Sequence, residues 1–378
     1  MDFQKLKNLM DSFTAWRIPG CAAAVYLHGE PIFEYSSGYA DKENGIKMSG
    51  DSLLYMYSAS KPVTCAAALT LWEKGEFLLN DPVYKYMPEW SDMKVLHRRE
   101  DGTEALVPAE RPVTIGDLFA MTSGLDYSTD RPSLKKARER TYPRCNTVEL
   151  MRAVGKDPLI FQPGERWNYG ISHDVLGAII EIISGYSLKD YAKKAVFEPL
   201  GMDKSFYGGW EIPEGLAVQY QFIDEKDAYV PTDQRNTFVM GSDFYSGGAG
   251  IVSTVKDMAK FAGAMSMKGK TPDGERILAP STVELMRTNR LSQKQLSAFD
   301  WDTLMGYGYG LGVRTMINRA AAGSPSPNGE FGWTGAAGAY MLIDPENELS
   351  LFYAHHMLNN QEAYTANRLR NVLYSCLD

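Results

Sequence analysis

The sequence has 378 residues, of which 44% are hydrophobic, and it carries a formal net charge of -8. A chain of this composition can bury a large core, so it is not expected to be disordered, and its length favours two subdomains or one large catalytic unit. The acidic balance, with no dense cluster of Lys and Arg, argues against a nucleic-acid-binding protein.

Targeting signals and metal motifs are also missing from the sequence. Residues 1–7 lack the apolar core of a signal peptide, and no apolar run reaches the roughly 18 residues that a membrane span requires. Neither H-E-x-x-H, C-x-x-C nor a phosphate-binding G-x-x-x-x-G-K-[ST] motif occurs. The cysteines have no zinc-like or redox spacing: Cys21, Cys65, Cys145 and Cys376. We therefore expect a cytoplasmic protein with reduced thiols, no metal and no cofactor.

The predicted elements begin with an amphipathic helix over residues 2–16, whose apolar positions recur at helical spacing. Two strand-like runs follow, at 21–27 and 31–36. Between them lies His28-Gly29-Glu30, a hairpin signal that predicts an antiparallel pair.

The middle of the chain is predicted to be mainly helical, with helices at 62–74, 114–122, 147–154, 173–184 and 187–198. A second pair of strands, at 339–344 and 348–355, and a final helix close the chain. The simplest assembly is an α/β (α+β) fold with one antiparallel sheet built from both termini and flanked by helices. The predicted division is one α/β subdomain from residues 1–60 and 240–378, with residues 61–239 as a mainly helical insertion.

The motif left to carry chemistry is S-x-x-K, which occurs at Ser58/Lys61, Ser91/Lys94, Ser133/Lys136 and Ser253/Lys256. The surrounding sequence has to show which of these copies is catalytic. Ser91 and Ser133 lie in polar segments, and Ser253 is interpreted as a helix cap after a glycine-rich stretch. Ser58 follows the apolar run 53–57 and begins a helix rich in small residues, which can sit deep in the molecule.

Three residues apart on a helix, Ser58 and Lys61 project from the same face. Burial and the helix dipole both disfavour the proton on Lys61, so a partly desolvated amine can take part in activating the serine hydroxyl. The alternative interpretation makes Ser58 a helix cap and Lys61 a surface charge, and spacing alone leaves both open.

Residues 58–64 resemble the nucleophile segment of the serine β-lactamase and penicillin-binding-protein superfamily, in its class C and family VIII carboxylesterase branch. Five further blocks resemble that branch in the same order, at 113–125, 161–177, 199–202, 247–254 and 332–335. The resemblance covers residues 18–358. It implies the β-lactamase/transpeptidase-like fold and a serine hydrolase that works through an acyl-enzyme on Ser58.

The same resemblance implies roles for residues that spacing could not select. Tyr169 matches the second-motif tyrosine, a proton shuttle beside Ser58 and Lys61, because a phenol near a lysine ammonium has its ionised form favoured. The oxyanion hole would be formed by the backbone amides of Ser58 and Ala336, the residue just after the third motif.

Two departures from the superfamily pattern bear on the substrate. The second motif is usually Y-x-N, and Ile171 stands in place of the asparagine after Tyr169. The third is usually K-T-G, and here it is Trp333-Thr334-Gly335. Neither Ile171 nor Trp333 can supply the amide or the cation with which a β-lactam is held. These four residues, Ile171 and 333–335, are the predicted substrate-binding set.

The favoured function is therefore a carboxylesterase acting on small or aromatic acyl esters. The alternatives are a β-lactamase or D-amino-acid peptidase of the same fold, and a non-catalytic binding protein. The presence of Ser58, Lys61 and Tyr169 argues against the binding protein. Arg314, on the predicted strand after residues 307–310, is the one candidate cation to compensate for the missing lysine, although a lone cation there favours a structural role. The expected partner is a small ester or amide, with no nucleic acid and no membrane span, and the oligomeric state is left open.

Overall fold

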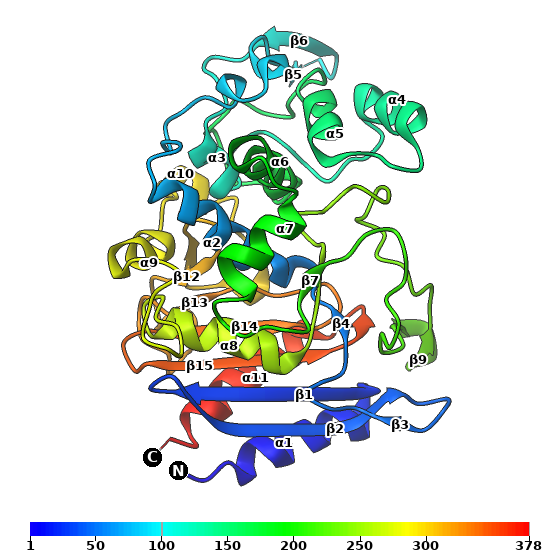
Figure 1. Cartoon of the computed structure of the whole chain (residues 1–378), viewed down its shortest axis with the longest axis vertical. Helices are drawn as coiled ribbons and strands as arrows, with labels where there is room; N and C mark the ends of the chain where they lie inside the picture. The colour runs from blue at the N-terminus through cyan, green and yellow to red at the C-terminus, as the bar shows by residue number, and fades with distance from the viewer. Residues whose placement is uncertain (100, 378) are drawn as a thin grey trace.

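A computed structural model describes residues 1–99 and 101–377 and is organised around an eight-stranded antiparallel sheet (Figure 1). The strand order is β11-β12-β13-β14-β15-β1-β2-β3. The strands are β1 (Gly20–Leu27), β2 (Glu30–Asp41), β3 (Ile46–Lys47), β11 (Tyr307–Tyr309), β12 (Arg314–Met316), β13 (Phe331–Gly332), β14 (Tyr340–Asp344) and β15 (Leu349–His355). The expected sheet from both termini is confirmed, because β1 pairs with β15 from Cys21 opposite His355 to Leu27 opposite Leu349.

Helices cover both faces of this sheet. Successive residues of a strand point to opposite faces. In β1, Cys21, Ala23 and Val25 pack in one apolar cluster with α1 (Gln4–Trp16) and α11 (Glu362–Tyr374). Ala22 and Ala24 belong to the main hydrophobic core, as do residues of α8 (Val255–Ser266), which lies on the opposite face (Figure 1).

The predicted helix cap at Ser253 is wrong. Ser253 is the last residue of a strand, and its hydroxyl pairs with that of Ser205 at 2.6 Å. Thr254 caps α8 instead, because its side-chain oxygen accepts a hydrogen bond from the amide of Asp257 at 3.1 Å.

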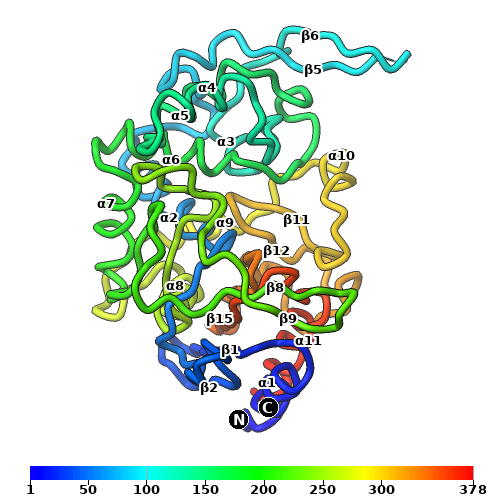
Figure 2. Tube along the Cα trace, turned by 90° about the vertical axis from the view of Figure 1, so that its right-hand side faces the viewer, coloured from blue at the N-terminus to red at the C-terminus, as the bar shows by residue number. Residues whose placement is uncertain are grey.

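The middle of the chain is mainly helical, with α2 (Ser60–Trp72), α3 (Ile115–Phe119), α4 (Pro132–Thr141), α5 (Thr147–Val154), α6 (Ser172–Ser184) and α7 (Leu188–Ala192). A π-helical turn, Lys193–Phe197, continues α7. Helices α2 and α6 pack together and are buried along most of their length. Figure 2 shows the hairpin of β5 (Lys94–Arg98) and β6 (Glu104–Pro108) at the end of the molecule farthest from the termini.

Short elements connect these two regions. One small sheet has the order β4-β10-β7 and another β16-β8-β9. The remaining elements are β4 (Leu54–Tyr55), β7 (Phe206–Tyr207), β8 (Tyr220–Ile223), β9 (Ala228–Pro231), β10 (Ile251–Ser253), β16 (Met357–Leu358), α9 (Pro280–Arg287) and α10 (Gln293–Leu296). Within residues 1–99 and 101–377, every helix is too short or too polar to span a bilayer.

Candidate active site

Ser58 lies in a tight 3₁₀ turn, Tyr57–Ala59, between β4 and α2. Tyr57 has a left-handed backbone (φ 46°), which costs a residue with a Cβ about 1–2 kcal/mol. Its buried ring is fixed by a hydrogen bond from its hydroxyl to Oε1 of Gln219 at 2.5 Å. The turn leaves Ser58 partly accessible while Ala59 on its helix side is buried. A strained, well-anchored turn therefore presents the Ser58 hydroxyl.

Lys61 is fully buried in the first turn of α2. Its Nζ donates to Ser58 Oγ at 3.1 Å, to Tyr127 Oη at 2.9 Å and to the Gly248 carbonyl at 2.8 Å. Three acceptors match the three N–H bonds of an ammonium group. A buried charge is tolerated when it is hydrogen-bonded in this way, so the site accommodates protonated Lys61.

Two tyrosines flank this lysine. The Tyr169 ring centroid lies 4.5 Å from Lys61 Nζ, and the Tyr169 hydroxyl accepts a hydrogen bond from Trp333 Nε1 at 2.9 Å. Tyr127 approaches with its hydroxyl, and burial followed by the neighbouring Tyr169 raises the pKa of Tyr127 well above its ordinary value. Tyr127 therefore stays a neutral phenol. Sequence analysis missed it, and its place two residues after the block 122–125 was the available signal.

The third-motif segment lies directly against the nucleophile turn. An added Cβ on Gly335 would come within 2.4 Å of the carbonyl oxygen of Met56, two residues before Ser58. Only glycine permits that approach. Thr334 forms a bridge to Tyr340, and Ala336, two residues after Thr334, is exposed. The structure thus brings the predicted oxyanion residues Ser58 and Ala336 onto neighbouring segments.

Aromatic rings line the side of the site around Tyr169 and Trp333, and we call them the aromatic cluster: Trp167, Tyr169, Phe299, Trp301, Tyr309 and Trp333. The centroid of Tyr169 lies 5.1 Å from Trp301 and 5.5 Å from Trp333. Trp333 is buried, whereas Trp301 is 41% exposed. The cluster therefore offers an apolar wall that ends at an accessible indole.

Ile171 and Arg314 lie elsewhere. Ile171 is 3% exposed and packs in the main hydrophobic core, outside the aromatic cluster. The guanidinium of Arg314 is buried and donates to Glu330 Oε1 at 3.4 Å and to the Met341 carbonyl at 3.0 Å. Since its charge is engaged inside the sheet, Arg314 is not positioned to replace the third-motif lysine.

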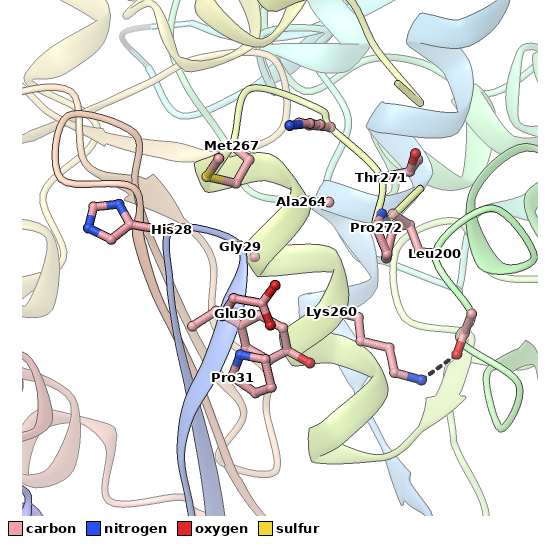
Figure 3. Close-up of a pocket in the computed structure, with 14 residues that line it drawn as sticks. His28, Gly29, Glu30, Pro31, Leu200, Lys260, Ala264, Met267, Thr271 and Pro272 are labelled. Carbon is pink, nitrogen blue, oxygen red and sulfur yellow. Dashed lines mark hydrogen bonds between the residues drawn. The ribbon is translucent and has the colours of Figure 1, made fainter. Parts of the chain in front are cut away.

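A surface hollow of about 460 Å³ lies away from these residues, between the β1–β2 turn and α8 (Figure 3). Its rim carries His28, Glu30 and Lys260, and none of the predicted site residues lines it. The Lys260 ammonium is already bound to the Gly201 carbonyl and to Asp257. The hollow is therefore a surface feature separate from the residues around Ser58.

Comparison with known proteins identifies the family of the chain. The family model described as Beta-lactamase matches residues 5–374. An uncharacterised protein of Mycobacterium tuberculosis is 33% identical over 347 residues, covering 89% of this chain and 85% of that protein. Esterase EstB of Burkholderia gladioli is 29% identical over 364 residues, covering 89% and 85%.

Among solved structures, the fold is similar to that of EstCE1, described as a hydrolase with promiscuous acyltransferase activity. The TM-score is 0.80 at 23% identity, with 98% of each chain covered. At that identity the likeness concerns the fold. The expected β-lactamase/transpeptidase-like architecture is thereby confirmed, and so is the resemblance that the motifs indicated.

Proposed function

The chain belongs to the beta-lactamase family, and from this premise we propose that it is a carboxylesterase that forms an acyl-enzyme on Ser58. The observation that carries the proposal is the 3.1 Å contact between Ser58 Oγ and the buried Lys61 Nζ, with Tyr169 beside it. Covalent catalysis requires a nucleophile that is held in place with a base beside it, and here Lys61 holds Ser58 while Tyr169 is the proposed base. The similarity to an esterase of Burkholderia gladioli supports an ester substrate.

In the proposed reaction, Ser58 Oγ attacks the ester carbonyl carbon while its proton passes to Tyr169 acting as a phenolate base. Trp333 Nε1, which donates to the Tyr169 oxygen at 2.9 Å, stabilises that phenolate. The proton then moves to the alcohol as it leaves, and water hydrolyses the acyl-enzyme by the reverse sequence. Tyr127 is not assigned as the base because its raised pKa keeps it protonated.

The negative charge on the carbonyl oxygen would be stabilised by the amides of Ser58 and Ala336. A preorganised donor of this kind contributes about 2.7–4 kcal/mol to the transition state. Thr334 and Gly335 lead the chain into this position, and the close approach of Gly335 to Met56 holds the two segments together.

The substrate class follows from the walls of the site. Trp333 stands where a cation would bind a substrate carboxylate, and Trp301 is the accessible end of the aromatic cluster. Aromatic surfaces favour apolar groups and do not stabilise an anion. We therefore assign small or aromatic acyl esters as substrates, with Trp333, Thr334 and Gly335 as the proposed substrate-side residues. Ile171, which is buried in the main core, is no longer proposed to contact the substrate.

The first prediction tests the nucleophile. Ser58→Ala should lower turnover of p-nitrophenyl butyrate by on the order of 10⁴-fold or more, because the covalent intermediate can no longer form. Turnover and labelling by a fluorophosphonate probe are measured on the same purified protein. Ser91→Ala is the matched control, since Ser91 also stands in an S-x-x-K pattern but is exposed.

Full activity and labelling in the Ser91→Ala protein, with both lost in Ser58→Ala, would support the proposal. Near-wild-type turnover by Ser58→Ala would show that another group is the nucleophile. A wild-type protein that neither reacts with the probe nor turns over esters would favour a binding protein on this fold.

A further inference from the structure

A buried carboxylate beside Lys61 has no part in the mechanism described so far. Asp174 lies in the first turn of α6, is 3% exposed, and accepts hydrogen bonds from Ser246 Oγ at 2.6 Å and from the Gly248 amide at 3.4 Å. The carbonyl of the same Gly248 accepts the 2.8 Å hydrogen bond from Lys61 Nζ. One glycine peptide segment therefore connects the carboxylate to the catalytic amine.

Gly248 also sets how closely the two groups approach. A Cβ added there would lie 3.0 Å from Asp174 Oδ2 and 3.5 Å from Lys61 Nζ. The Asp174 carboxylate and the Lys61 ammonium therefore both lie next to the Gly248 α-carbon, on the side where a side chain would stand. With no side chain between them, the charges interact in a water-poor interior, where electrostatic attraction is strong.

The other titratable groups that face Asp174 stay neutral. Burial lowers the pKa of His173, on the same helix, to about 3. Burial likewise raises the pKa of Tyr207 on β7 and that of Tyr127. Burial also raises the pKa of Asp174 itself, and the Ser246 hydroxyl and Lys61 oppose that rise. Lys61 is therefore the cation that Asp174 faces.

We propose that ionised Asp174 is a positioning residue that aims the Gly248 carbonyl at Lys61 and, by its charge, keeps Lys61 protonated in the resting enzyme. The inference rests on the proposed function, because it assigns Lys61 its charge during the acylation of Ser58. The place of Asp174 in the first turn of α6 favours its negative charge, since the helix dipole is positive at that end. The Lys61 ammonium then donates a hydrogen bond to each of its three acceptors, and one of these bonds holds Ser58 Oγ in place.

The test is the pH dependence of fluorophosphonate labelling at Ser58 in wild type, Asp174→Asn and Ser246→Ala. Asn has the shape of Asp and keeps one acceptor oxygen for Ser246 and the Gly248 amide, so Asp174→Asn removes the charge while exchanging the second oxygen for an amide donor. The alkaline limb of the labelling rate should then move to lower pH by about one unit or more, because an opposite charge at short range has been lost. Ser246→Ala keeps the charge and removes one hydrogen bond, so it should lower the rate without moving the limb.

An unmoved alkaline limb in Asp174→Asn, or an equal shift in Ser246→Ala, would overturn the inference and leave Asp174 a structural residue. Should Asp174→Asn fold poorly, Gly248→Ala gives the same test by pushing a methyl group between the two charges, and the limb should again move down. Absence of labelling at Ser58 in the wild type would instead contradict the proposed function. The two failures are therefore distinguishable.

Discussion

At the residue scale, Lys61 is the centre of the proposed mechanism because its three donors are distributed over three different segments. One reaches Ser58 in its own turn, one reaches Tyr127 after α3, and one reaches Gly248 before β10. Tyr169 closes the site through its ring face, 4.5 Å from Nζ. In the proposed mechanism these groups act as a unit, so the loss of one should disturb proton transfer through the others.

The second prediction tests whether Lys61 and Tyr169 act as a unit. Lys61→Ala and Tyr169→Phe should each reduce kcat/KM for p-nitrophenyl butyrate by on the order of 10³-fold or more, and the double variant should be little worse than the poorer single one. A double-mutant cycle measures the coupling, with thermal melting of each variant as the control for folding. Losses that multiply would contradict a shared role for the two residues.

The sequence predicted some site residues from local spacing and others only from resemblance, and it missed one. The contact between Ser58 and Lys61 follows from three-residue spacing at a helix start, a local property. Tyr169 could be placed only by resemblance, because nothing local distinguishes it among 22 tyrosines. Tyr127 was missed because its hydroxyl reaches Lys61 across 66 positions of sequence, and only its place two residues after the block 122–125 pointed to it.

At the scale of elements, the site depends on how closely two segments approach. The segment after β13 passes against the turn before α2 because Gly335 has no side chain. Its amide donates to the Ala339 carbonyl at 2.8 Å, which anchors the segment to the start of β14. Ala336, the next residue, therefore follows beside the nucleophile turn, where the proposed mechanism needs an oxyanion donor.

The third prediction is that Gly335→Ala lowers kcat by about 10²–10³-fold, the loss expected when one oxyanion donor is displaced. The added Cβ would meet the Met56 carbonyl at 2.4 Å and the Ala339 Cβ at 3.0 Å, so the segment must move away from Ser58. Overpacking of this kind costs about 1–3 kcal/mol, which should lower Tm while leaving the protein folded.

A second change separates the two contacts of that Cβ. Ala339→Gly, added to Gly335→Ala, removes the contact with the Ala339 side chain and leaves the one with the Met56 backbone. Activity should therefore not return in the double variant, and the loss of activity should appear in kcat rather than in KM. Recovery in the double variant would show that side-chain crowding, and not the position of the nucleophile turn, was responsible.

Elements with strong periodicity were predicted well, and short polar ones were not. The expected helices at 147–154 and 173–184 correspond to α5 and α6. The helix expected at 62–74 begins two residues earlier, at Ser60, because Pro62 fits the first turn. No helix was predicted at α10 (Gln293–Leu296), a four-residue polar turn defined by the capping box of Ser292 and Gln295.

At the scale of the whole molecule, the site lies where the helical region meets the sheet. Ser58 and Lys61 come from early in the chain, Tyr169 from the middle, and Trp301 and Trp333 from the last quarter. The sheet built from both termini could be predicted from paired strand signals at the two ends. The assembly of the aromatic cluster could not, because it depends on tertiary packing between segments up to 166 positions apart in sequence, as Trp167 and Trp333 are. The predicted subdomain boundaries stay a prediction.

The final prediction concerns the selectivity of this assembled site. Short-chain and aromatic esters should be hydrolysed far better than penicillins or cephalosporins, because Trp333 replaces the cation and Ile171 the amide that β-lactam recognition uses. A charge-assisted hydrogen bond is worth about 1.5–3 kcal/mol and a neutral one about 0.5–1.5 kcal/mol. Together their loss is a handicap of about 30- to 2000-fold against β-lactams.

Arg314 was the one cation considered able to offset this handicap, and its guanidinium is engaged with Glu330 and the Met341 carbonyl inside the sheet. The full handicap is therefore expected. The measurement compares kcat/KM for p-nitrophenyl butyrate and nitrocefin on one preparation, with Ser58→Ala as the blank for both substrates. A nitrocefin value equal to or above the ester value would overturn the esterase assignment and establish a β-lactamase, whose carboxylate-binding group would then have to be a residue other than Trp333 or Arg314.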